Sequence, residues 1–128
     1  MEIHESAEDY LEKILMLKKT KGFVRSIDIA NMLGYSKPSI SIAMKHLREN
    51  GYVTMDKDNY IDLTEAGQKI AERIYFRHQT LTQFLEGLGV SHENADKDAC
   101  KIEHDISDES FAKLREFLEK CLAAKAED

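Results

Sequence analysis

The segment DACKIEHDIS, residues 98–107, places a thiol, several carboxylates and an imidazole within ten positions. In a helix, Cys100, Glu103 and His104 stand at positions i, i+3 and i+4, so their side chains project from one face. That face is neither an apolar stripe nor an ordinary run of solvated charges. Sulfur, carboxylate oxygen and imidazole nitrogen are the ligands of divalent transition metals, and the segment therefore indicates a metal site.

Two other predicted helices carry further ligand candidates. Asp9 and Glu12 lie three residues apart, so both carboxylates share a helix face, and His78 follows the apolar residues of YFRHQTL. Taken singly, each has an ordinary role: a helix-dipole partner, a hydrogen-bonded histidine or, for Cys100, a small core residue. Taken together, they form a set of three acids, two imidazoles and a thiol on three helices, which favours a divalent cation.

The elements that position these residues are predicted to be mostly helices. Apolar residues recur at helical spacing, with Ser26 and Ser36 as N-cap candidates and Gly34 as a C-cap. The alternating run around Asp56–Asn59 predicts a hairpin of Tyr52–Met55 with Tyr60–Leu63. The expected helices are residues 4–22, 26–33, 36–50, 64–89, 92–107 and 108–124.

This order of elements predicts a fold class that is mostly α. Two helices joined by a Gly turn and followed by a hairpin are typical of a winged helix-turn-helix. We expect a DNA-binding domain in residues 1–70 and a helical metal-binding and dimerisation domain in residues 71–128. The helices after residue 77 carry more apolar surface than so small a chain can bury, which predicts a homodimer.

The distribution of charge favours a nucleic-acid partner for the first part. Residues 13–57 hold nine basic and three acidic residues, a net charge of +6, whereas the rest of the chain carries −12, giving −6 in total. The second helix of a helix-turn-helix normally enters the major groove of DNA. Base readout would rest on Pro38, Ser39 and Ile42 and on DNA shape. The predicted DNA contacts are Arg25, Ser26, Ser36, Lys37, Pro38, Ser39, Ser41, Ile42, Lys45 and Lys57.

Composition indicates the compartment. We find neither a signal-peptide pattern at the start nor a run of 18 apolar residues, and two cysteines form no disulfide framework. The expectation is a cytoplasmic, reduced protein with no membrane partner and no organic substrate, and with Cys100 available as a ligand.

Four segments, EDYLEKILML, SKPSISIAMKHLRENGYV, FRHQTLTQFL and DACKIEHDIS, resemble the diphtheria-toxin-repressor family of metal-dependent transcriptional repressors. The resemblance covers nearly the whole chain. It implies a repressor, not an enzyme, that binds double-stranded operator DNA when one or two Fe²⁺ or Mn²⁺ ions are bound per subunit. It also implies that Zn²⁺ or Co²⁺ can occupy the site in vitro. The family's ligand positions correspond to Asp9, Glu12, His78, Cys100, Glu103 and His104.

Several departures from the family pattern bear on the metal and the operator. The chain ends after the sixth helix, as in short manganese-type members without an SH3-like domain. Asp9 matches the manganese type, whereas Cys100 matches the iron type, so the ligand set is a hybrid. Thr82 and Asp96 stand near the iron-type ancillary metal site, which predicts a weakened second site. Ile42 replaces a polar groove residue, which predicts a different operator.

The sequence leaves other functions open. A winged-helix regulator controlled by an organic ligand or by oxidation of Cys100 is the main alternative. A metalloenzyme or a metal-storage protein would not need the wing or the basic first part. In the metal-controlled case, we expect the cation to offset repulsion among Asp9, Glu12 and Glu103 and to fix the separation of two recognition helices near one DNA turn, about 34 Å.

Overall fold

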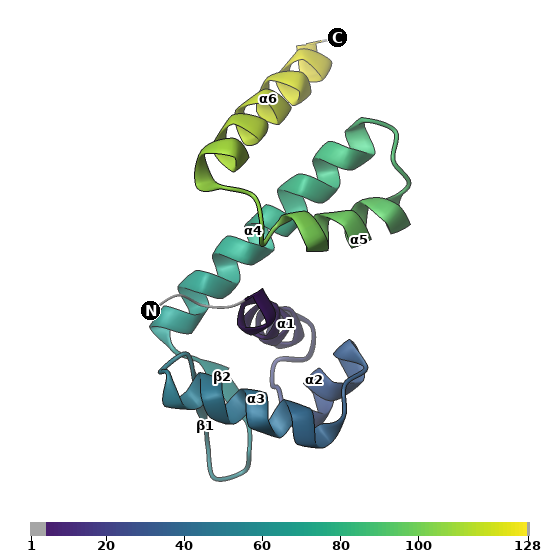
Figure 1. Ribbon diagram of the computed structural model, residues 1–128. Coiled ribbons are helices and arrows are strands. Elements are labelled where there is room, and N and C mark those ends of the chain that lie inside the picture. Colours follow the sequence, from purple (N-terminus) through teal and green to yellow (C-terminus); the bar gives the residue numbers. More distant parts are fainter. Residues whose placement is uncertain (1–4, 128) are drawn as a thin grey trace. The chain divides into compact units, whose positions relative to one another are not determined.

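The structure is a computed structural model that describes residues 5–127, and it confirms a mostly helical fold with a small hairpin (Figure 1). The described elements, in chain order, are α1 (Glu5–Lys21), α2 (Ser26–Leu33), α3 (Lys37–Glu49), β1 (Val53–Met55), β2 (Ile61–Leu63), α4 (Glu65–Gly87), α5 (His92–Ile102) and α6 (Asp108–Glu127). None of the helices among these residues is long and apolar enough to cross a membrane.

The chain divides into two compact units, residues 1–75 and 76–128, and the division falls within α4. The first unit holds α1, α2, α3, the hairpin and the start of α4. The second holds the rest of α4 with α5 and α6.

Helix α2 of the first unit is capped one residue earlier than predicted. Ser26 is the first helical residue, and Arg25 occupies the N-cap in extended conformation, so the expectation of a Ser26 cap is wrong. The physical reason is Asp28, whose carboxylate accepts a 2.9 Å hydrogen bond from the Arg25 backbone N–H and thereby fixes the boundary. The predicted C-cap is confirmed, since Gly34 adopts the left-handed conformation at φ 73°.

Helix α3 begins as predicted. The Ser36 hydroxyl accepts from the backbone N–H of Ser39, and Pro38 lies in the first turn, where a missing N–H costs little. Ile40, Met44 and Leu47 are buried at helical spacing. These residues join Leu11 and other apolar side chains of α1, α2 and the hairpin in one core, which leaves the opposite face of α3 exposed.

The wing is a two-stranded antiparallel hairpin in which Val53 pairs with Leu63 and Met55 with Ile61. Each strand begins one residue later than predicted. The Ile61 N–H donates to the Val24 carbonyl at 2.7 Å, which ties the wing to the α1–α2 connection. A Cβ at Gly67 would lie 2.0 Å from the Tyr52 carbonyl oxygen, so the start of α4 can approach the wing only with glycine there.

In the second unit, α5 is shorter than predicted. It ends at Ile102, and residues 103–105 form a turn, so the expectation of a helix through residue 107 is wrong. The Ser107 hydroxyl accepts from the Ser110 N–H at 3.1 Å and starts α6 separately, which competes with continuation of α5. Glu103 nevertheless keeps helical dihedrals, φ −58° and ψ −26°. The predicted shared face of Cys100, Glu103 and His104 therefore survives the early end of the helix.

Candidate metal site and nucleic-acid interface

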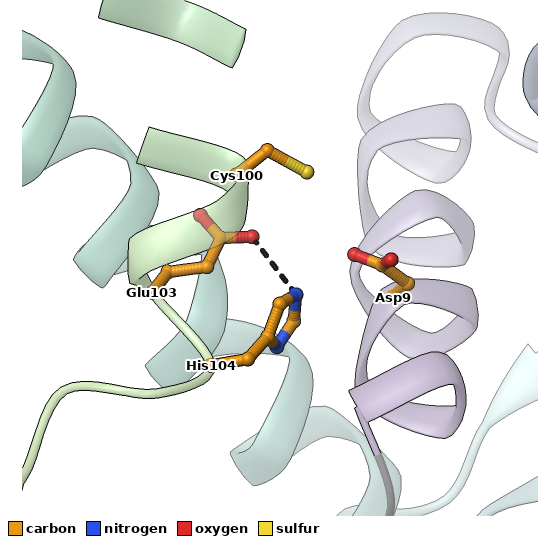
Figure 2. A group of neighbouring side chains, drawn as sticks. All are labelled: Asp9, Cys100, Glu103 and His104. Atoms are coloured by element: carbon orange, nitrogen blue, oxygen red, sulfur yellow. Dashed lines mark ion pairs between the residues drawn. The ribbon is translucent and has the colours of Figure 1, made fainter. Parts of the chain in front are cut away.

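Three of the predicted metal ligands lie together at the end of α5 in the second unit. The ligand atoms of Cys100, Glu103 and His104 are all within 4.8 Å of one another. Figure 2 shows these three side chains coming from one stretch of chain, with a dashed line for the ion pair between Glu103 and His104; Asp9, also drawn, comes from α1 of the first unit. Thiol, carboxylate and imidazole therefore converge as the helical spacing predicted.

Glu103 occupies the centre of this group. It has no exposed surface, its Oε1 lies 3.4 Å from His104 Nε2, and its Oε2 lies 2.8 Å from His78 Nδ1. The side chain of His104 is 1% exposed. A buried carboxylate with one imidazole at each oxygen offers two faces for a cation, and such a charge is stable in the interior only with a cationic or hydrogen-bonding partner.

Asp96 is a site residue that the sequence analysis placed only near an ancillary site. Its Oδ1 lies 2.8 Å from His78 Nε2, so both ring nitrogens of His78 face carboxylates. A metal-binding histidine commonly donates its second ring N–H to a carboxylate, which orients the imidazole. The i+18 separation left no sequence signal for this pairing.

The remaining two predicted ligands, Asp9 and Glu12, belong to α1 of the first unit. Glu12 is buried, with Oε1 3.3 Å from Lys13 Nζ, and among the described residues its Oε2 has no hydrogen-bond partner. A buried carboxylate oxygen without a donor is uncommon in folded proteins and requires a physical explanation, of which binding to a cation is one. This observation fits a role for Glu12 in binding a cation.

A hollow of about 360 Å³ lies between α4 and α5 in the second unit, and Thr82 and Asp96 are among the residues that line it. Asp96 is engaged by His78. Farther along the same hollow, His92 Nδ1 lies 2.5 Å from Glu86 Oε1, and this hydrogen bond raises the pKa of His92. Thr82 adds a neutral hydroxyl group to the lining of this hollow.

The predicted DNA contacts all lie in the first unit, and four of them share a groove of about 430 Å³. Arg25, Ser26, Ser41 and Lys45 line it. The groove also includes residues that were not predicted: Ile27, Arg48, Met55 and Asn59. Two guanidinium groups and an ammonium group on a concave surface suit phosphate oxygens.

The other predicted contacts lie at the exposed start of α3 or on the wing, outside this groove. Ser36 and Ser39 hydroxyls bond to each other at 2.9 Å, and the side chain of Ile42 is 59% exposed. Lys57 lies in the turn between β1 and β2. These positions are Ser36, Lys37, Pro38, Ser39, Ile42 and Lys57.

Sequence reasoning missed Tyr60 and Arg48 on this surface. The Arg25 guanidinium lies 4.3 Å from the centre of the Tyr60 ring, which joins the start of α2 to the wing. Arg48 is three residues after Lys45 on the same exposed side of α3, so its spacing could have revealed it. The contact between Arg25 and Tyr60 could not be predicted, because the two residues are far apart in the sequence.

An apolar groove of about 420 Å³ separates the end of α4 from α6 in the second unit. Phe84 and Phe117 meet edge to face, with ring centroids 6.5 Å apart. The side chains of Leu88, Phe117 and Leu122 are 67%, 59% and 42% exposed. Several large apolar side chains thus remain in contact with solvent on one surface.

The chain matches two family models that follow one another along its length. Residues 2–60 match the N-terminal DNA-binding domain of iron-dependent repressors. Residues 64–123 match the iron-dependent repressor metal-binding and dimerisation domain. The two matches correspond to the part with the wing and the part with the Cys100–His104 turn.

Curated and solved relatives agree with these matches. The chain is 39% identical over 102 residues to the transcriptional regulator MntR of Geobacillus kaustophilus, covering 80% of this chain and 72% of that protein. It is 36% identical over 118 residues to an uncharacterized HTH-type transcriptional regulator of Methanocaldococcus jannaschii, covering 91% and 94%. The solved manganese regulator SloR superposes with a TM-score of 0.79 at 30% identity, covering 88% of this chain and 53% of that one.

The chain thus spans about half the length of the solved relative and most of the length of the two curated ones. Matched domains, matched order and identity over most of two relatives agree on one assignment. The chain therefore belongs to the diphtheria-toxin-repressor family of metal-dependent regulators, whose members are DNA-binding transcriptional regulators rather than enzymes.

Proposed function

We propose that this chain is a repressor whose binding to operator DNA is switched on by Mn²⁺ or Fe²⁺, held by Asp9, Glu12, His78, Cys100, Glu103 and His104. The observation that carries the proposal is the buried Glu103 carboxylate, which has an imidazole at each oxygen and the Cys100 thiol beside it. The same chain carries a winged helix-turn-helix with a basic groove.

The donor set fits a divalent first-row cation. Carboxylates suit Mn²⁺, imidazoles suit Fe²⁺ as well as Zn²⁺, and a thiolate favours the softer ions. A cation at His78 Nδ1 would leave Nε2–H to donate to Asp96, which lies at hydrogen-bond distance already. Because each oxygen of Glu103 faces a different histidine, the carboxylate offers places for one ion or two.

The cation would act on DNA binding in two ways. It would neutralise the carboxylates, and its ligands would come from both units of the chain. Two proposed ligands come from α1 in the first unit and four come from α4, α5 and the turn after α5 in the second. Without a cation, the carboxylates of Asp9, Glu12 and Glu103 repel one another. A cation neutralises them and favours one arrangement of the DNA-binding unit, which is a population shift toward the binding-competent state.

The groove between α2, α3 and the wing would receive the DNA backbone. Arg25, Lys45 and Arg48 supply its positive charge. The exposed start of α3 would enter the major groove, where Ile42 favours contact with a thymine methyl group. A DNA partner and two free cysteines fit work in the reducing cytoplasm.

A second copy of the chain would cover the apolar groove between α4 and α6. The matched family model is described as a dimerisation domain, and the exposed side chains of Leu88, Phe117 and Leu122 lie within it. Phe111 and Leu118, two other large apolar residues of α6, are 8% and 9% exposed. These two residues therefore stabilise the unit itself, and the dimer contact would rest on the others.

The test is selection of DNA from a pool of random duplexes by the purified protein under anaerobic, reducing conditions. With Mn²⁺ or Fe²⁺ we expect enrichment of one pseudo-palindromic sequence, and with a chelator we expect none. Equal enrichment with chelator would refute the proposal. Enrichment that follows oxidation of the thiols, independent of metal, would instead favour the redox-controlled regulator.

A further inference from the structure

The turn that carries Glu103 and His104 lies outside any helix, yet its geometry is needed for both proposed ligands. The last bonds of the α5 ladder reach this turn, with Glu103 N–H donating to the Ala99 carbonyl at 2.9 Å and Ile106 N–H to the Ile102 carbonyl at 3.1 Å. The carbonyl groups after Ile102 have no partner in the helix and need donors from elsewhere. The donor that the structure supplies determines how firmly the turn is held.

Arg77 supplies these donors from α4. Its Nη1 donates to the Glu103 carbonyl at 3.1 Å and to the Ile106 carbonyl at 2.8 Å. Its Nη2 pairs with the carboxylate of Asp108, the first residue of α6. One guanidinium therefore fastens the start of the turn, its end and the next helix.

The guanidinium is also shielded from solvent and fixed in place. Arg77 is 3% exposed, and its guanidinium carbon lies 5.2 Å from the centre of the Phe111 ring, which is itself buried. Arg77 directly precedes His78 on α4. A buried arginine that makes directed hydrogen bonds loses little freedom per bond, because its fork is planar and rigid.

We propose that Arg77 is a positioning residue for the metal site, holding Glu103 and His104 in ligand geometry before the cation arrives. The inference rests on the proposed function, because it assumes that these two residues bind metal. Lysine would keep the positive charge but could not direct donors to two carbonyls and a carboxylate in one plane. Loss of the fork leaves two carbonyl groups to find other donors or to move.

The sign of the effect separates positioning from simple electrostatics. Arg77 places a positive charge on the proposed site's own turn, so removing it would strengthen cation binding if only Coulomb repulsion mattered. Positioning predicts the opposite. Loss of a partner that orients metal ligands typically weakens metal binding by about 10–100-fold.

The experiment is an anaerobic Co²⁺ titration of the full chain, followed by the thiolate-to-cobalt absorption band. For Arg77→Met we expect binding weakened about 10–100-fold and, at saturating Co²⁺, a shifted band. The matched control is Arg115→Met, which removes a positive charge from an exposed arginine that lies over Phe76 and pairs with Glu119. Wild-type affinity and band in Arg77→Met, or tighter binding, would overturn the inference.

The two proposals fail in distinguishable ways. If the wild-type protein neither binds Co²⁺ nor shows a thiolate band, the metal site itself is wrong. If the wild type binds and Arg77→Met binds equally well, only the role of Arg77 is wrong. Should Arg77→Met lose its helical circular dichroism, Arg77→Lys decides: at least tenfold weaker Co²⁺ binding supports positioning, and unchanged binding refutes it.

Discussion

Exchange of the Cys100 thiol for a carboxylate should change the metal preference of the site. The Cys100 sulfur belongs to a group of donor atoms that lie within 4.8 Å of one another, and the residue is only half-buried. The longer side chain of Cys100→Glu therefore has solvent to extend into and removes little core packing. A hard carboxylate in place of a soft thiolate favours Mn²⁺ over Co²⁺. We expect the ratio of the two affinities to move about tenfold, or about 1.4 kcal/mol.

The assay is DNA binding titrated anaerobically with Mn²⁺ and with Co²⁺, using a duplex recovered from the random pool. Cys121→Ser is the matched control, because Cys121 is the other free cysteine and is exposed on α6. The control should keep the wild-type ratio of activation midpoints and the thiolate-to-cobalt band. An unchanged ratio in Cys100→Glu, or loss of the band in Cys121→Ser alone, would show that Cys100 is not a ligand.

Four other substitutions or measurements should affect metal binding, DNA binding, dimerisation and stability separately. At a Mn²⁺ concentration 100 times the wild-type Kd, metal should stabilise the wild type by about 2.7 kcal/mol; a 100-fold loss of affinity in Glu103→Gln would leave about 0.4 kcal/mol, measured as a shift in Tm. Lys45→Gln should weaken DNA binding across sequences and reduce the salt slope by about one unit in anisotropy titrations. Phe117→Glu should produce monomers by sedimentation, because it places a charge in the apolar groove. The hydrogen bond from Lys21 lowers the pKa of Asp28 below 3.8, so the ionised Asp28 stabilises the fold above that pH and this contribution is lost as the pH falls. In urea at pH 7, the free energy of unfolding of Asp28→Asn should be about 1 kcal/mol below that of the wild type, and this difference should narrow below pH 3.8.

Features fixed by neighbouring residues could be predicted from the sequence. Gly34 and Ser36 mark the end of α2 and the start of α3, because a left-handed C-cap and a hydroxyl N-cap depend on local backbone geometry. The hairpin follows from alternation and from a turn that includes Asn59 at φ 66°. The shared face of Cys100 and Glu103 follows from helical spacing in the same way.

Features that depend on distant partners could not be predicted. Arg77 reaches carbonyl groups 26 and 29 residues away, and Asp96 meets His78 across 18 residues. In the sequence, residues 98–107 look like a continuous helix. Nothing in that segment signals the turn, because the guanidinium that donates to its carbonyl groups comes from α4. The burial of Phe111 has the same origin, since its ring packs with Leu81 and Ala99 of other helices.

We propose that metal binding and DNA binding are coupled in this chain. The most direct measurement is the affinity for the selected duplex with and without Mn²⁺, together with the affinity for Mn²⁺ with and without the duplex. We expect at least about tenfold tighter DNA binding with Mn²⁺ and an equal factor in the reverse direction, because coupling free energies are reciprocal. DNA affinity that is the same in Mn²⁺ and in chelator, in a protein that binds both ligands, would contradict it.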